Sequence, residues 1–230
     1  MAKSGAKSQL RSRQAVGSND TRLALIGAAI ETLKADGFAG ASARAIAGRA
    51  GCNQGLVFYH FGSVVNLLLA ALDAVSAARL EHYGDSVSGV DSISGLVDAA
   101  AAIFEEDLNA GHITVLVEMI GGASSSPGLG AEVAKRIAPW TQFAQRSVDA
   151  SIAGSPFDSV IPSGDLALAI VALYMGLEML SHLDGDRAPA LALFAHAKRL
   201  AALFEGFGGS NLLTAAPQTP AGVPLPEEAP

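Results

Sequence analysis

The segment from Gly37 to Phe61 constrains the fold of this chain more than any other, because it reads as two short helices joined by a tight turn. Ser42 stands at an N-cap position, before apolar residues that are spaced for one helix face. Gly51 follows at the point where a residue with positive φ ends a helix, and Asn53 can cap the next helix. Two helices separated by so short a turn have the geometry of a helix-turn-helix, whose second helix lies in the major groove of DNA.

Together with the helical segment before it, this stretch resembles the DNA-binding region of the TetR family of transcriptional regulators. The resemblance runs from about Thr21 to Leu69. The residues that carry it are Asp36-Gly37-Phe38, Ser42-x-Arg44-x-Ile46-Ala47, Ala50-Gly51 and Gly55-x-Val57-x-Tyr59-His60-Phe61. It implies an all-α fold, in which a three-helix N-terminal helix-turn-helix DNA-binding domain precedes a larger helical domain that binds a ligand and dimerises.

Two positions depart from the family pattern. The family often has Tyr where Phe58 stands, and Phe58 cannot donate a hydrogen bond to phosphate and can pack instead. The family also often has a Lys within the segment that here reads Gly62-Ser63-Val64. These two phosphate contacts are therefore not expected, and the basic residues at the N-terminus can compensate.

The predicted recognition helix, residues 54–60, supplies side chains suited to DNA. Gln54 can pair with adenine, Leu56 can contact a thymine methyl group, and Tyr59 can hold phosphate. Arg44, near the start of the preceding helix, is the best candidate for a bidentate contact to guanine, with a surface salt bridge as its alternative role. The predicted DNA-binding residues are Ser42, Arg44, Asn53, Gln54, Gly55, Leu56, Tyr59 and His60.

The net charge of −7 is divided unevenly along the chain. Residues 1–62 hold eight basic and three acidic residues, a net charge of +5, whereas the remainder holds seven basic and nineteen acidic residues, a net charge of −12. The positive part is expected to meet a polyanion, and the acidic part to point away from it. Residues 1–19 are polar and basic, so we expect a disordered arm that either contacts DNA or is an inert tail.

The rest of the chain is predicted to be helical, because it is rich in Ala and Leu and is broken only by Gly- and Pro-containing loops. We expect a DNA-binding domain over residues 20–68, an effector-binding and dimerisation domain over 69–210, and a disordered Pro-rich tail over 211–230. The predicted helices are Thr21–Ala35, Ser63 to about Tyr83, Ile93–Ala110, Ile113–Ile120, Leu129–Ile152 with a possible kink at Pro139, Asp165–Leu183 and Pro189–Phe207. The last two have the apolar content of a homodimer interface.

The larger domain is expected to enclose a pocket for a largely apolar effector. Arg146 favours an anionic group on that effector, or it pairs with an acid such as Glu178. The alternative for the aromatic residues is ordinary core packing. The predicted lining residues are Phe104, Leu108, Met119, Trp140, Phe143, Arg146, Tyr174, Met175 and Glu178, and further candidates are Val115, Glu118 and His182.

Other classes of protein are disfavoured. Glu178, His182 and Asp184 fall short of a metal-ligand set, so no metal or cofactor is expected. The Gly-rich segments near Gly121 and Gly128 do not follow a predicted strand, so they do not indicate a phosphate-binding loop or an enzyme. The single cysteine, Cys52, fits a reducing compartment, and the longest apolar run, residues 166–177, is too short to span a membrane. We therefore expect a cytoplasmic protein without a membrane partner.

The function predicted from these patterns is that of a transcriptional repressor that an unknown small-molecule effector releases from a pseudo-palindromic double-stranded DNA operator. One alternative is an activator of the same fold. Another is an architectural DNA-binding protein without an effector, which would show weak sequence preference and no pocket.

Overall fold

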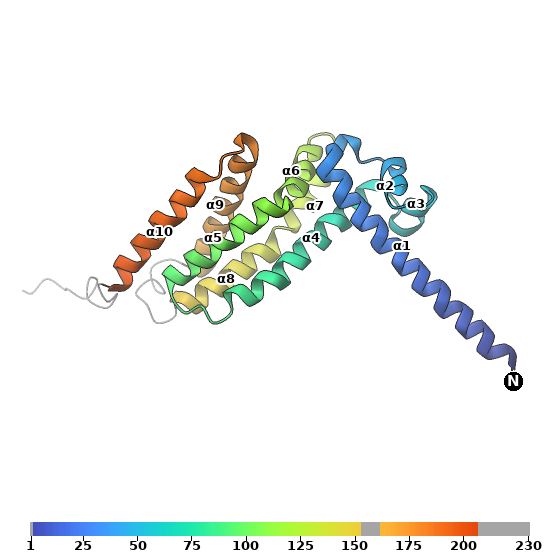
Figure 1. Cartoon of the computed structure of the whole chain (residues 1–230), viewed down its shortest axis with the longest axis horizontal. Coiled ribbons are helices and arrows are strands. Elements are labelled where there is room, and N and C mark those ends of the chain that lie inside the picture. Colours follow the sequence, from blue (N-terminus) through green and yellow to red (C-terminus); the bar gives the residue numbers. More distant parts are fainter. Residues whose placement is uncertain (1, 153–161, 207–230) are drawn as a thin grey trace, which may run out of the picture.

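The computed structural model describes residues 2–152 and 162–206, and this part of the chain consists of ten α-helices joined by short connections (Figure 1). The N-terminal domain comprises α1 (Ala2–Gly40), α2 (Ala43–Arg49) and α3 (Gly55–Phe61), and α4 (Val64–Val87) leads into the larger domain. The larger domain continues with α5 (Ile93–Ala110), α6 (His112–Ala123), α7 (Leu129–Lys135), α8 (Ala138–Ile152), α9 (Ser163–Asp184) and α10 (Ala188–Gly206). The expected all-α architecture is confirmed, while the predicted tail over residues 211–230 lies outside the described residues.

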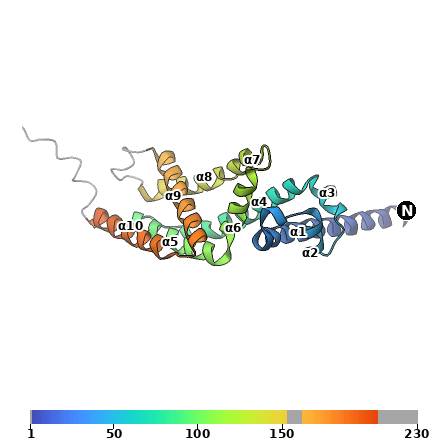
Figure 2. The ribbon, with the colours of Figure 1, turned by 90° about the horizontal axis from the view of Figure 1, so that it is seen from above.

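The first helix differs from the prediction, because it begins at Ala2 and includes the segment that we expected to be a disordered arm. Ala, Lys, Arg and Gln all favour helices, and the segment has no proline to stop α1 from extending toward the N-terminus. Both views show this part of α1 projecting away from the rest of the molecule (Figures 1 and 2). At the other end, Gly37 has φ of 69° and breaks the helical path just before Phe38.

Local signals place α2 and α3 as predicted. The Ser42 hydroxyl accepts a hydrogen bond from Ala45 N at 3.2 Å, so Ser42 is the N-cap of α2. Gly51 has φ of 68° in the turn. The Asn53 carboxamide oxygen accepts a hydrogen bond from Gly55 N at 2.8 Å, so Asn53 holds the start of α3. Asn53 lies one residue before the N-cap position of α3, which is Gln54.

A continuous apolar core fixes the N-terminal domain on the larger one. Leu33 of α1, Ile46 of α2, Val57 of α3 and Leu67 of α4 are fully buried in the same cluster, which Met119 of α6 joins from the larger domain. Because α1 packs on both α4 and α6, any shift of those two helices changes the support of the DNA-binding domain.

Three helix boundaries in the larger domain differ from the predictions. The predicted helix over residues 129–152 is two helices with a break at residues 136–137, and Pro139 lies in the first turn of α8, where a missing N–H costs nothing. Helix α4 continues past Tyr83 to Val87. Helix α6 continues through Gly122 to Ala123, and the missing side chain of Gly122 leaves room for the ring of Phe38.

The last two helices pack on different partners, α9 on α8 and α10 on α5 (Figure 2). Both carry large apolar side chains that are exposed in the single chain: Leu168, Leu173, Leu180 and Leu183 on α9, and Leu193, Leu200 and Leu203 on α10. By length and composition alone α9 could cross a membrane, which corrects the expectation from the shorter apolar run. A helix that is buried inside a protein or between subunits has the same composition.

Candidate DNA-binding surface and ligand cavity

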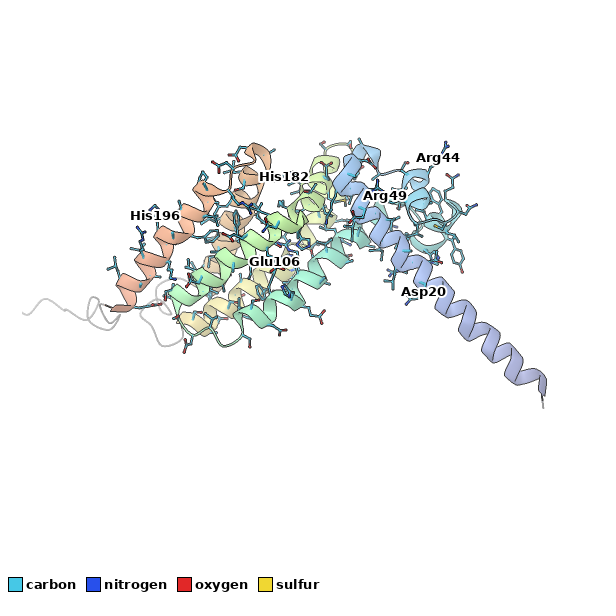
Figure 3. All side chains as sticks on the ribbon, viewed as in Figure 1. Asp20, Arg44, Arg49, Glu106, His182 and His196 are labelled. Carbon is cyan, nitrogen blue, oxygen red and sulfur yellow. The ribbon has the colours of Figure 1, made fainter. Side chains whose placement is uncertain are left out.

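The first candidate site is the outer face of α2 and α3. Ser42, Arg44, Gln54 and Gly55 are exposed there, and the side chain of Tyr59 is 76% exposed. Figure 3 shows Arg44 projecting from α2 away from the rest of the domain. Within the described residues Arg44 forms no ion pair, so the alternative role of a surface salt bridge has no partner there.

The second arginine of α2 is held differently. Arg49 donates to Asp36 at 3.0 Å and to the carbonyl oxygen of Glu31 at 3.3 Å, so it ties α2 to α1. Two arginines of one short helix are thus separated into one that is free to meet a ligand and one that is engaged in the fold.

Three residues of α3 modify the predicted contact set. Leu56 is half-buried and packs against the core, so it offers less surface to DNA than expected. His60 is also half-buried, with its ring edge against Tyr59. Phe58, which could have packed inward, is instead half exposed beside Tyr59.

The second candidate site is a cavity of about 330 Å³ in the larger domain, lined by residues of all the helices from α4 to α10. Most of its lining is apolar. Five of the predicted residues line it: Trp140, Phe143, Tyr174, Met175 and Glu178.

Four predicted residues do not line the cavity. Phe104 and Met119 are fully buried in the core, and Leu108 borders a separate shallow hollow. Arg146 is exposed on the outer face of α8, which removes the predicted Arg146–Glu178 pair and the reason for an anionic effector. Helical periodicity alone could not tell which face of α8 turns inward. Of the further candidates, Val115 is core, Glu118 contacts α1, and His182 is exposed.

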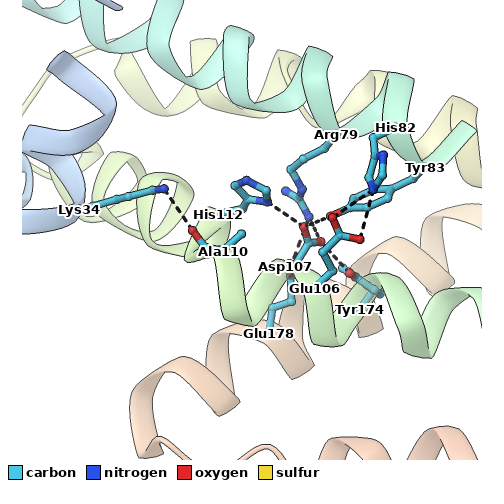
Figure 4. Close-up of polar contacts among 10 residues, drawn as sticks. All are labelled: Lys34, Arg79, His82, Tyr83, Glu106, Asp107, Ala110, His112, Tyr174 and Glu178. Carbon is cyan, nitrogen blue, oxygen red and sulfur yellow. Dashed lines mark hydrogen bonds and ion pairs between the residues drawn. The ribbon is translucent and has the colours of Figure 1, made fainter. Parts of the chain in front are cut away.

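A network of polar side chains closes one end of the cavity, and we call it the Asp107 cluster: Arg79, Tyr83, Asp107, His112, Tyr174 and Glu178 (Figure 4). Asp107 is completely buried and accepts hydrogen bonds from Arg79, from Tyr83 at 2.6 Å and from Tyr174 at 2.8 Å. His112 Nδ1 lies 3.1 Å from the same carboxylate. The cluster joins α4, α5, α6 and α9.

The two carboxyl groups of the cluster have opposite electrostatics. Burial alone would raise the pKa of Asp107, but the hydrogen bond from His112 and the charge of Arg79 outweigh burial and lower it. Burial raises the pKa of Glu178 to about 8, and the charge of Arg79 only partly opposes this. Asp107 is therefore the counter-ion of Arg79, and Glu178 is a second carboxyl group without a cation of its own.

Arg79 and Glu178 have unused hydrogen-bonding capacity. Glu178 Oε1 lies 3.5 Å from Arg79 Nη2, and the guanidinium carbon of Arg79 lies 4.4 Å from the centre of the Trp140 ring. Neither Arg79 Nε nor Glu178 Oε1 makes a hydrogen bond. The sequence predicted Glu178 but missed Arg79. Arg79 follows Leu72 and Val75 on the same apolar face of α4. Its position could have identified it, because a charged side chain on a buried face needs a partner.

Two contacts connect this end of the larger domain to the DNA-binding domain. Lys34 of α1 donates to the carbonyl oxygen of Ala110 at 3.1 Å, three residues after Asp107 (Figure 4). Glu118 of α6 accepts from Phe38 N at 2.8 Å, beside the backbone break at Gly37. In the described residues no group of three His, Cys, Asp or Glu side chains has the arrangement of a metal site.

Comparisons with known proteins agree with this architecture. Residues 25–71 match the family described as bacterial regulatory proteins, tetR family, whereas a search of curated proteins finds no match. A Rhodococcus protein assigned to the TetR family is similar in structure at 20% identity, with a TM-score of 0.65 over 79% of this chain and 98% of that one. A TetR family member from Streptomyces coelicolor is similar at 23% identity, with a TM-score of 0.56 over 77% of this chain and 97% of that one.

A third structure is that of FadR from Bacillus subtilis in complex with stearoyl-CoA, which is 13% identical, with a TM-score of 0.65 over 78% of this chain and 96% of that one. These likenesses support the fold of the whole chain, and the family match identifies its first domain. Residues 25–71 thus form a helix-turn-helix DNA-binding domain of the kind found in bacterial regulatory proteins of the tetR family, and the rest of the chain has the fold of TetR-family structures.

Proposed function

We propose that the protein is a cytoplasmic homodimeric repressor, which a small-molecule effector releases from a pseudo-palindromic operator. The observation that supports this most directly is that one chain holds both an exposed helix-turn-helix face and an apolar cavity whose polar end adjoins α1. An architectural DNA-binding protein without an effector would have no use for such a cavity.

The proposed operator contacts separate into base reading and phosphate binding. Arg44 is free and exposed, so we assign it to a guanine contact, and we assign the exposed hydroxyl of Tyr59 to phosphate. Gln54 and Gly55 begin α3 and would meet the groove floor, while Ser42 and Asn53 hold the two helix starts. Leu56 and His60 would contribute only through their exposed parts.

A second copy of the chain would cover the exposed leucines of α9 and α10. Leu180 is 61% exposed and Leu200 is 70% exposed, which is unfavourable for a soluble single chain. Pairing α9 and α10 about a twofold axis would form a four-helix bundle and set the spacing of the two recognition helices.

The effector would act by binding one spacing of the recognition helices more tightly than the other, since only differential affinity shifts an equilibrium. The physical connection is short: the Asp107 cluster joins α4, α5 and α6, and α1 contacts the end of α5 through Lys34 and α6 through Phe38. Binding at the cluster would therefore reach the support of the DNA-binding domain directly.

The test of the DNA-binding assignment begins with selection of bound duplexes from a random pool. We expect a pseudo-palindrome with half-sites about one helical turn, or a small multiple, apart. Arg44→Ala should cost about 1–3 kcal/mol in binding and relax preference at one position. Arg49→Ala is the matched control, because Arg49 is engaged by Asp36 and should leave the selected sequence unchanged. Occupancy of a single asymmetric half-site by a monomer would contradict the proposal.

The dimer is tested separately by measuring mass in solution for Leu180→Glu and Leu200→Glu. Both should yield monomers with weakened operator binding, whereas Leu23→Glu on α1 should remain dimeric. Recovery of the native protein in membranes rather than as a soluble dimer would show that a bilayer, and not a second copy, covers α9.

A further inference from the structure

The polar end of the cavity leaves one hydrogen-bond donor and one acceptor without partners. Among the described residues, the buried side-chain nitrogen and oxygen atoms that lack a hydrogen bond are Arg79 Nε and Glu178 Oε1, and both residues line the cavity. Glu178 is only 2% exposed. Leaving a buried polar group without a hydrogen bond is unfavourable, so two of them at one cavity wall favour a ligand that satisfies both.

We infer that the effector is an uncharged, largely apolar alcohol or phenol, whose hydroxyl group accepts a hydrogen bond from Arg79 Nε and donates one to Glu178 Oε1. This inference rests on the proposed function and specifies the chemical class of its effector. A hydroxyl group is the smallest group that both donates and accepts, so it matches the two free atoms without adding charge.

Charged head groups fit the cluster less well. A carboxylate would satisfy Arg79 but face the buried carboxylate of Asp107, which already neutralises Arg79. An ammonium group would satisfy Glu178 but face the guanidinium of Arg79. The other cation of the cavity wall, Arg136, is occupied by Asp73 at 2.7 Å and by Glu132 at 3.2 Å.

The remainder of the cavity accounts for the apolar body of the ligand. Side chains such as Val75, Ile103, Phe143 and Met175 line it, and Trp140 covers the guanidinium of Arg79. Ser147, one of the few other polar lining residues, already donates its hydroxyl to the carbonyl oxygen of Phe143 at 3.2 Å. Polar recognition is therefore concentrated at Arg79 and Glu178.

The test uses four probes of matched length: decanol, decanoic acid, decylamine and decane. Their binding to the full-length protein is measured directly, without DNA, by calorimetry or by competition with a fluorescent apolar probe. We expect decanol to bind about tenfold more tightly than each of the other three, since decane forms neither hydrogen bond and each ionised probe brings a like charge to Asp107 or to Arg79. Equal affinity for decanol and decane, or tighter binding of the acid or the amine, would overturn the inference.

Variants show whether the two atoms are responsible. Glu178→Leu should fold, because an apolar residue replaces a buried carboxyl group that lacks its own cation. It should also lose most of the preference for decanol over decane, since only the hydrogen bond from Arg79 Nε remains. Ser147→Ala is the matched control in the same cavity and should keep the decanol preference. A preference for decanol that is undiminished in Glu178→Leu would also overturn the inference.

Operator release is measured afterwards, so the two proposals can fail separately. If decanol binds with the expected preference but does not alter operator affinity, the assigned ligand class holds and the effector mechanism fails. If another chemical class releases the operator and no alcohol preference exists, the effector mechanism holds and the assigned ligand class fails.

Discussion

Replacing Asp107 with asparagine should be strongly destabilising, although the two side chains have nearly the same shape. The Asp107 carboxylate is completely buried and receives donors from Arg79, Tyr83, His112 and Tyr174. An amide NH₂ group in its place would face other donors and leave Arg79 without its main counter-ion. Breaking a buried ion pair by removing one partner costs about 3–5 kcal/mol.

The neighbouring residue provides the control. Glu106 pairs with His82 at 3.1 Å, but both side chains are more than half exposed, so Glu106→Gln should cost no more than about 1 kcal/mol. Urea unfolding at one fixed protomer concentration measures both variants, because the stability of a dimer depends on concentration. An Asp107→Asn penalty as small as that of Glu106→Gln would refute the assignment of Asp107 as the counter-ion of Arg79.

The penalty should also depend on pH, through Glu178. The folded-state pKa of Glu178 is raised to about 8 from its ordinary value of 4.5, so its contribution to stability is fully present below pH 4.5 and is lost as pH rises toward 8. In Asp107→Asn, Glu178 would become the counter-ion of Arg79, which lowers its pKa and removes that loss. The penalty should therefore be largest near pH 5 and smaller near pH 8. An equal penalty at both pH values would refute the role of Glu178 while leaving that of Asp107 intact.

Three further predictions concern the support of the DNA-binding domain. Gly122→Ala would place a methyl carbon 2.4 Å from the ring of Phe38 and should destabilise the fold by about 1–3 kcal/mol in thermal unfolding, whereas Gly121→Ala, which meets nothing within 4 Å, should be neutral or stabilising. Glu118→Ala removes the acceptor of Phe38 N and should weaken the effect of an effector on operator affinity, while Glu118→Gln, which keeps an acceptor, should retain it; identical behaviour of the two variants would rule out this bond as a coupling contact. Deleting residues 1–19 removes four cations and should flatten the salt dependence of DNA binding without lowering stability; equal salt slopes would show that this part of α1 does not contact phosphate.

Short-range patterns in the sequence determined the first domain. The N-cap at Ser42 and the positive φ at Gly51 depend on residues within a few positions, so their physical cause is contained in the local sequence. The same is true of the all-α architecture, which follows from composition and periodicity. The N-terminal part of α1 is the exception. Its polar and basic composition predicts disorder, although every residue type in it is compatible with a helix.

The cavity and its polar end were decided by tertiary structure. Trp140 and Glu178 could be proposed from the sequence, but Arg146 was assigned to the wrong side of α8, since periodicity identifies a helix face and not the neighbour that it meets. Arg79, Asp107 and Glu178 are separated by 28 and more residues and meet only because α4, α5 and α9 pack together. Packing also determines which buried atoms keep their hydrogen bonds and which remain free, because a side chain's partners come from other helices.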